Sequence, residues 1–147
     1  MKVTFNKISQ GESEYAVVNA YGRTTAIDTA IGLLENGEQI IMGYKDGESI
    51  PCPISKIYYV ETVDDRCFAY TKDDCIELRS RLYEIESALD FRFFRCSKSM
   101  LCNIRKIKSV KAETNARMRA VLLNGETILI TRSYVKEMKK RLGLSKS

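Results

Sequence analysis

The sequence predicts an α+β fold that is mainly β in its C-terminal two-thirds, and three observations carry this prediction. Short runs of β-branched and aromatic residues recur along the chain, as in residues 57–61 and 66–70. Asp-Gly and Asn-Gly turn signals separate several of these runs. Apolar residues follow helical spacing in only a few segments. Together these patterns predict about nine strands and about three helices.

Residues 1–38 are predicted to form a small strand–strand–helix extension. Residues 3–8 alternate weakly between apolar and polar side chains, which is typical of a strand. Residues 15–21 form a second candidate strand, with a helix as the alternative for the same segment. A helix then begins at a pattern resembling a capping box at Thr25 and ends at an Asn-Gly stop signal. The main domain accordingly spans residues 39–147.

The main domain is predicted to contain several antiparallel hairpins, a short additional strand and two helices. The predicted strand pairs are residues 39–44 with 49–52, residues 57–61 with 66–70, and residues 117–123 with 127–130. A short strand is expected at residues 107–110. One helix is predicted to open at Thr71 and to present an apolar face that ends at Leu89. The last helix is predicted to begin near Ser133 and to end at Gly143.

The composition argues against catalysis. The chain contains no histidine, which excludes Ser-His and Cys-His nucleophile pairs and histidine metal ligands. The five cysteines are odd in number and form no CxxC pattern, so neither a disulfide framework nor a zinc ribbon is predicted. No pair of carboxylates lies in a recognisable catalytic motif. We therefore expect a protein that is not an enzyme and uses no metal or cofactor.

The apolar segments are too short for insertion into a membrane. A membrane-spanning helix needs ~20 apolar residues, and no run in the sequence approaches that length. The N-terminus also lacks the apolar stretch of a secretory signal. These features predict a cytoplasmic protein.

Charge is distributed unevenly along the chain. Residues 1–91 carry 9 Lys/Arg and 16 Asp/Glu, a net charge of −7, whereas residues 92–147 carry 15 Lys/Arg and 3 Asp/Glu, a net charge of +12. A basic half joined to an acidic half is typical of a protein that binds a polyanion. Charge alone leaves DNA, RNA and an anionic membrane surface open as partners.

Several common nucleic-acid-binding motifs are missing from the sequence. A helix-turn-helix requires two adjacent helices, but the basic half offers only one. Zinc fingers require Cys and His, and the aromatic strand motif of the RNA-recognition module is absent. Any reading of nucleic acid must therefore use loops or strands.

Four motifs follow one another along the main domain. They are Ile57-Tyr58-Tyr59-Val60-Glu61, the run from Phe93 to Asn103, Leu123-Asn124-Gly125-Glu126, and Ile130-Thr131-Arg132-Ser133-Tyr134. In this order and at this spacing they resemble the LytTR DNA-binding domain family. The resemblance covers about residues 40–143. It implies an elongated arrangement of small antiparallel β-sheets with short helices at the sides. It also implies loops that enter successive major grooves of double-stranded DNA, in regulators that act at repeated promoter sites.

The resemblance places DNA contacts on three loops. These loops are Asp64-Asp65-Arg66, Ser97-Lys98-Ser99 and Thr131-Arg132-Ser133. Together with flanking polar residues, the candidate DNA-binding set is Arg66, Arg95, Ser97, Lys98, Ser99, Asn103, Lys108, Lys111, Thr131, Arg132 and Ser133. Lys98 and Arg132 are the expected readers of guanine edges, and Ser97 and Ser99 are expected to donate to phosphates.

Some of these residues have structural alternatives. Arg95 could equally pair with a carboxylate that supports the fold, and Asn103 is also a typical turn or backbone-capping residue. Lys108 and Lys111 alternate like the exposed face of a strand and would add contacts that do not depend on DNA sequence.

These observations predict a sequence-specific DNA-binding transcription regulator. Residues 1–38 are too few for a receiver domain, so regulation is expected through concentration, the N-terminal extension or a separate partner. The expected partners are double-stranded DNA and a second copy of the chain on that DNA. Family analogy adds a membrane-bound inhibitor as a partner. The alternative function is a basic adaptor that binds a membrane or a protein partner without reading DNA sequence.

Overall fold

The computed structural model describes residues 1–144. The chain divides into two compact units, Met1–Gly37 and Glu38–Ser147, which we call unit 1 and unit 2. No helix in the described part is long and apolar enough to cross a bilayer.

Unit 1 contains one regular element, the helix α1 (Thr25–Asn36). The strands predicted at residues 3–8 and 15–21 are not formed, and this part of the sequence prediction was wrong. A turn at Ser9–Glu12 connects the two segments, but the segments form no β-ladder in the structure. The physical reason is that two isolated strands with no further strand or helix packed on them are marginal in water.

The start of α1 also differs from the predicted capping box. Thr24, not Thr25, is the N-cap, and its hydroxyl accepts a hydrogen bond of 3.2 Å from the Ile27 N–H. Asp28 instead accepts a hydrogen bond of 2.6 Å from Arg23. Apolar side chains of unit 1 are largely exposed, including those of Phe5, Tyr15 and Leu34, which are 89%, 87% and 68% exposed. Unit 1 therefore lacks a core of its own.

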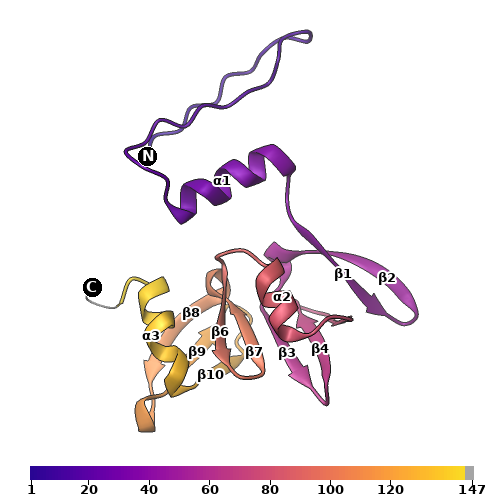
Figure 1. The fold of residues 1–147 in the computed structure, drawn as a ribbon, viewed down its shortest axis with the longest axis vertical. Coiled ribbons are helices and arrows are strands. Elements are labelled where there is room, and N and C mark those ends of the chain that lie inside the picture. Colours follow the sequence, from indigo (N-terminus) through magenta and orange to yellow (C-terminus); the bar gives the residue numbers. More distant parts are fainter. Residues whose placement is uncertain (145–147) are drawn as a thin grey trace. The chain divides into compact units, whose positions relative to one another are not determined.

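Residues 38–144 of unit 2 form two antiparallel sheets and two α-helices, and Figure 1 shows how these are arranged. The larger sheet has the strand order β2-β1-β5-β4-β3-β7-β6 and the smaller has the order β10-β9-β8. The strands of the larger sheet are β1 (Ile40–Lys45), β2 (Glu48–Pro53), β3 (Tyr59–Val63), β4 (Arg66–Tyr70), β5 (Cys75–Leu78), β6 (Phe93–Ser97) and β7 (Met100–Asn103). Those of the smaller sheet are β8 (Ile107–Ala112), β9 (Met118–Leu122) and β10 (Thr127–Ile130). The helices are α2 (Leu82–Ala88) and α3 (Arg132–Arg141).

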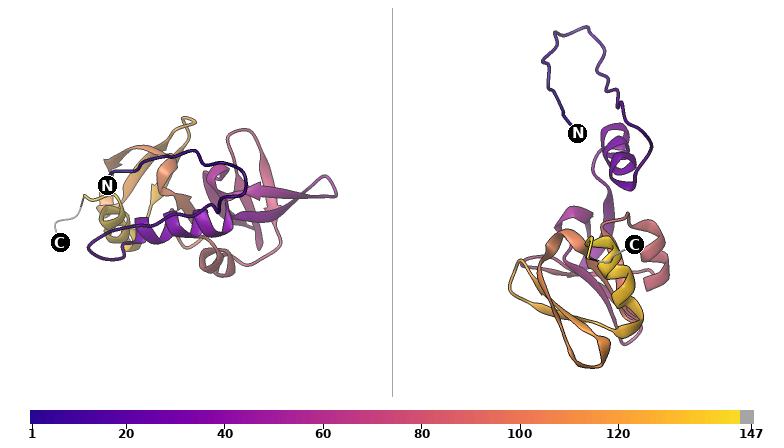
Figure 2. Two further views of the ribbon diagram at one scale, coloured as in Figure 1. Left: turned by 90° about the horizontal axis from the view of Figure 1, so that it is seen from above. Right: turned by 90° about the vertical axis from the view of Figure 1, so that its left-hand side faces the viewer.

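Each face of the larger sheet is covered by a separate apolar cluster. Leu82 and Ile85 of α2 pack with Val60 of β3 on one face. Tyr59, the neighbour of Val60, belongs to the cluster on the other face, where β9, β10 and α3 contribute side chains such as Met138. This alternation follows from the opposite direction of successive side chains in a strand. The views in Figure 2 show the larger sheet of unit 2 between α2 and the smaller sheet.

The α+β class with mainly β structure is confirmed, and the three predicted strand pairs of the main domain are all present. Asp46 and Gly47 have φ angles of 51° and 78°, as a type I′ turn requires. Gly125, in the Asn-Gly turn between β9 and β10, has a φ of 89°. The C-terminal helix starts at Arg132 and is followed by Gly143 at φ 72°, in agreement with the predicted start and stop.

One helix was misplaced by the sequence analysis. The helix predicted from Thr71 begins only at Leu82, because the preceding residues form β5, which pairs with β4 and touches β1. Ile76 and Leu78 are buried while Glu77 between them is not, which is the two-residue period of a half-buried strand. Sheet pairing therefore prevails over the helical spacing that continues into this segment.

Candidate nucleic-acid interface

The three predicted DNA-contacting loops lie at the same edge of unit 2. Figure 1 shows the β3–β4 turn, the β6–β7 turn and the start of α3 together at the lower end of the sheets. The main chain joins them, because the Thr62 N–H donates to the Ser99 carbonyl at 2.8 Å and the Thr131 N–H donates to the Cys96 carbonyl at 2.9 Å. The β6–β7 hairpin is thus the central member of the edge. We call these three loops the turn edge.

The β3–β4 turn is acidic for a conformational reason. Asp64 and Asp65 have φ angles of 50° and 63°, a left-handed conformation that Asp tolerates better than most residues. The adjacent Arg66 donates two hydrogen bonds to Glu77, at 2.9 and 2.8 Å. The hydrogen bond from Arg66 lowers the pKa of the Glu77 carboxyl. The only cation of this turn is therefore already offset by a carboxylate.

The β6–β7 turn presents an exposed lysine on a supported main chain. The Arg95 guanidinium donates to the Lys98 carbonyl at 2.5 Å and forms an ion pair of 3.1 Å with Glu86. Arg95 therefore holds the turn in place, which is the fold-supporting role that the sequence left open. Lys98 itself is exposed, and its ammonium makes no ion pair among residues 1–144. The Ser97 and Ser99 hydroxyls lie 3.4 Å apart.

At the third loop, the chain passes from β10 into α3. Thr131 is the N-cap residue of α3, but its hydroxyl lies 3.5 Å from the Cys96 carbonyl and does not cap the helix. Arg132 and Ser133 follow as exposed residues. The first N–H groups of a helix lack partners within the helix and favour an anion. This loop therefore combines a guanidinium with uncapped helical N–H groups.

Asn103 does not belong to this surface, so its selection as a DNA contact needs correction. It is only 1% exposed, its amide donates to the Ile57 carbonyl at 2.9 Å, and its side-chain oxygen accepts from the Arg105 N–H at 3.0 Å. Both polar atoms serve the main chain, which leaves none for a base. Asn103 is a structural residue, the alternative that the sequence analysis kept open.

Lys108 and Lys111 lie on β8, one of the two edge strands of the smaller sheet, and both are exposed. The C-terminal helix adds the exposed Lys136, Lys139 and Lys140. By contrast, Arg141 donates to the Phe91 and Phe93 carbonyls at 2.6 and 3.0 Å, so it anchors α3 to the start of β6.

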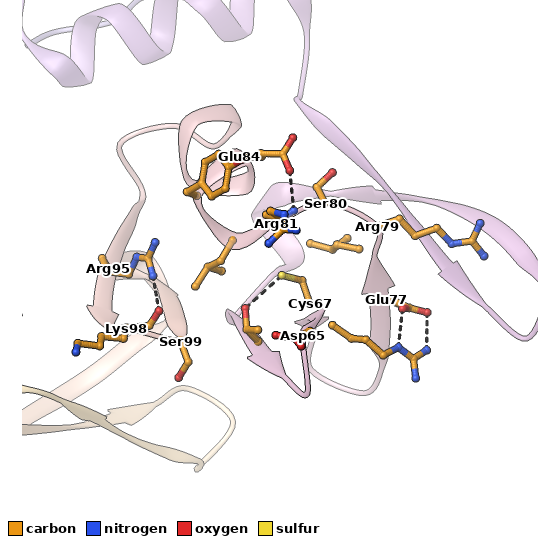
Figure 3. A pocket seen from close by; sticks show the side chains of 15 residues that line it. Asp65, Cys67, Glu77, Arg79, Ser80, Arg81, Glu84, Arg95, Lys98 and Ser99 are labelled. Carbon is orange, nitrogen blue, oxygen red and sulfur yellow. Dashed lines mark hydrogen bonds and ion pairs between the residues drawn. The ribbon is translucent and has the colours of Figure 1, made fainter.

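A hollow of about 880 Å³ opens beside the turn edge. Its walls come from the β3–β4 turn, the segment between β5 and α2, and the β6–β7 turn, as Figure 3 shows. It brings together Arg66, Arg95, Lys98 and Ser99 from the predicted set. It also contains Arg79 and Arg81, which are absent from the predicted set because the segment from Thr71 to Leu89 was expected to form a helix. The alternation of Ile76 and Leu78 with polar residues indicates a strand, and a strand here would have placed both arginines in a connection between a strand and a helix.

The fold and this edge together define a class of protein. Cations and hydroxyls on three turns form a surface suited to phosphates and base edges. The three α-helices of residues 1–144 are separated by strands, so the surface does not rely on a helix-turn-helix. Among the same residues, no cluster of His, Cys, Asp or Glu is arranged to hold a metal. The class is a mainly β nucleic-acid-binding module that presents loops.

Comparison with known proteins agrees with this class. The family model described as the LytTr DNA-binding domain matches residues 47–143, and the chain belongs to that family. Its fold matches a LytTr DNA-binding domain from Bacillus cereus with a TM-score of 0.68 and 27% identity, covering 73% of this chain and 99% of that one.

Relatives of similar length occur in Staphylococcus aureus. Uncharacterized HTH-type transcriptional regulators from the bovine RF122 / ET3-1 strain and from strain NCTC 8325 / PS 47 are each 29% identical to this chain over 119 residues. In both cases the match covers 81% of this chain and 80% of the relative. The HTH label in their names has no counterpart in the described residues of this chain.

Proposed function

We propose that this protein is a transcription regulator that binds double-stranded DNA in a sequence-specific manner and reads repeated promoter sites. The observation that carries the proposal is the turn edge, on which Lys98 and Arg132 are exposed, make no ion pair among residues 1–144, and lie on adjacent loops that a main-chain hydrogen bond joins. Membership of the LytTr DNA-binding domain family supports the same conclusion.

The side chains of the turn edge would divide the work between specificity and affinity. Lys98 and Arg132 carry exposed cations with no ion pair among residues 1–144, and these cations could reach the O6 and N7 acceptors of guanine in the major groove. Ser97, Ser99, Thr131 and Ser133 offer hydroxyl donors to the flanking phosphates. Arg66 takes part only when a phosphate competes with Glu77 for its guanidinium.

Lys108 and Lys111 would supply contacts that do not depend on sequence. Both lie on an edge strand and are exposed. Neutralising phosphates releases condensed counterions, a gain that is similar for every DNA sequence.

Unit 1 would serve the regulation of this activity. Its apolar side chains are exposed. Domains below ~40 residues usually need disulfides, a metal or a partner in order to fold. We infer that a second copy, recruited on adjacent DNA sites, is one such partner. A second candidate partner, inferred from family analogy, is a membrane-bound inhibitor.

Selection of bound duplexes from a random pool tests the proposed function directly. The expected result is a short enriched motif that recurs at a fixed spacing. An unenriched pool, together with tight binding to random duplexes, would reduce the function to general DNA binding. Binding to anionic vesicles that persists when Lys98 and Arg132 are both replaced by alanine would favour the adaptor alternative.

A further inference from the structure

Arg81 is a cation that the proposed function has not used. It lies between β5 and α2, lines the hollow beside the turn edge, and is exposed. Its main-chain N–H donates to Glu84 at 3.0 Å, which fixes the backbone where α2 begins. Its guanidinium forms no ion pair within the part of the chain that the structure describes.

The other arginines of the hollow are engaged elsewhere. Arg66 is paired with Glu77, and Arg95 is paired with Glu86 and bound to the Lys98 carbonyl. The Arg79 guanidinium stacks on the Tyr44 ring, 3.8 Å from the centroid, and in Figure 3 this side chain extends away from Arg81. Among residues 1–144, Arg81 is therefore the arginine of the hollow whose guanidinium has neither an ion pair nor an aromatic partner.

The position of Arg81 relates it to the turn edge. The turn that carries Lys98 forms one wall of the hollow, the β3–β4 turn forms another, and Arg81 lines the same hollow. In Figure 3 Arg81 lies above both turns, beside Ser80 and Glu84. Lys98 and Ser99 of the β6–β7 turn line the same hollow as Arg81, so a duplex that contacts this turn would lie at the hollow. Duplex DNA carries one negative charge per ~1.7 Å of axis, and this close spacing would offer a phosphate to the Arg81 side chain.

We propose that Arg81 is a further DNA-contacting residue that binds a backbone phosphate of the duplex held by the β6–β7 turn; this inference rests on the proposed function. The guanidinium is suited to the task because its planar N–H groups can grip phosphate oxygens in pairs. The carboxylates of Asp65, Glu77 and Glu84 also line the hollow. They disfavour a small free anion, whereas a duplex also gains contacts along the turn edge.

The test compares Arg81→Gln with wild type in full-length protein. Anisotropy titrations from about 50 to 200 mM salt are made on a selected duplex and on a random duplex. The slope of log K against log salt is expected to become shallower by about one, with an equal fold-loss of affinity on both duplexes. Arg81→Lys should keep the slope. Thermal melting by circular dichroism checks that each variant is folded.

Arg79→Gln is the matched control, because it removes the same charge two residues away from a side chain held on Tyr44. Its slope should equal that of wild type. An unchanged slope for Arg81→Gln would overturn the inference, and so would an equal change in both variants. A loss confined to the selected duplex would also overturn it, because a phosphate contact does not depend on sequence.

A second experiment, with pyrophosphate, distinguishes a site for DNA phosphate from a site for a small free anion. If pyrophosphate stabilises the DNA-free protein through Arg81, and Arg81→Gln leaves the DNA slope unchanged, the hollow is a small-anion site and the inference fails. Wild-type protein that shows no salt-dependent DNA binding at all would instead defeat the proposed function.

Discussion

Glu77 restrains the only cation of the β3–β4 turn. Its carboxylate accepts two hydrogen bonds from Arg66. The lowered pKa of Glu77 keeps this carboxylate charged at pH values below the usual titration range of glutamate. A phosphate that approaches Arg66 must therefore compete with a charged carboxylate, which weakens binding to any sequence.

Replacing Glu77 with glutamine is predicted to strengthen DNA binding. The change removes a negative charge beside the turn edge and frees Arg66 for a phosphate. The salt slope should steepen by up to about one, on specific and random duplexes alike. Asp74→Asn is the control, because Asp74 pairs with Lys45 at 2.5 Å near the opposite end of β5. Weaker binding by Glu77→Gln would show that the pair positions Arg66 for DNA.

Asn103 gives a prediction that separates stability from binding. Asn103→Ala leaves the Ile57 carbonyl and the Arg105 N–H without their partners, and each buried unsatisfied group costs ~1–3 kcal/mol. We expect the free energy of unfolding to fall by about 2 kcal/mol or more, as measured by urea denaturation. The folded variant should keep its DNA affinity. A large loss of affinity at full folding would return Asn103 to the interface.

At the scale of elements, the β6–β7 hairpin positions the other two loops of the turn edge. It pairs with β3 on one side, and its Cys96 carbonyl accepts the Thr131 N–H on the other. Arg95 fixes the turn of this hairpin through Glu86, which follows Ile85 in α2. Ladder hydrogen bonds and an ion pair therefore fix the position of the turn edge.

Lys98→Ala and Arg132→Ala are each predicted to weaken binding to the selected duplex by ~1–3 kcal/mol, the usual cost of losing a good base contact. Anisotropy on the selected and random duplexes measures the difference. Lys72→Ala is a suitable control, because Lys72 is exposed on the β4–β5 connection. This connection lies at the end of β4 opposite to the β3–β4 turn, and therefore away from the turn edge. Equal losses on both duplexes would identify Lys98 and Arg132 as phosphate contacts.

At the scale of the whole molecule, the charge belongs almost entirely to unit 2. Unit 1 has three Lys/Arg and four Asp/Glu, whereas residues 38–147 have 21 Lys/Arg and 15 Asp/Glu, a net charge of +6. The buried apolar residues also lie in unit 2. Electrostatic binding and stability should therefore both reside in residues 38–147.

The salt dependence of binding tests this distribution. If about 6 to 8 cations neutralise phosphates, log K should fall against log salt with a slope of about −5 to −7. Lys108→Ala or Lys111→Ala should reduce the magnitude of the slope by about one on every sequence. A slope near zero would contradict the polyanion interpretation and the proposed function with it.

Removal of residues 1–37 is predicted to keep this slope and to abolish DNA-promoted pairing of two copies. The truncated chain should begin at Glu38, because the Gln39 amide donates to the Ala88 carbonyl at 2.6 Å and the Glu38 carboxylate accepts from Ser55. Light scattering with a two-site duplex measures the pairing. A full-length protein that forms a tight, salt-insensitive dimer without DNA would contradict this prediction.

The family resemblance indicated the three loops, whereas the sequence by itself determined the α+β class, the tight hairpin turns at Gly47 and Gly125, and the final helix. These features depend on local chemistry. Positive φ angles favour Asp, Asn and Gly, and a two-residue or helical period reports which face is buried. The basic C-terminal half was likewise visible as a count of charges.

Only the tertiary structure decided which candidates face outward and which cations are already paired. Contacts between residues distant in the sequence decide both points. The Asn103 amide donates to the Ile57 carbonyl, Arg66 pairs with Glu77, and Arg95 pairs with Glu86. Sheet pairing also turned Cys75–Leu78 into a strand, because ladder hydrogen bonds and burial against β4 outweigh a weak local helical pattern. That same pairing placed Arg81 beside the turn edge, where no local pattern had indicated it.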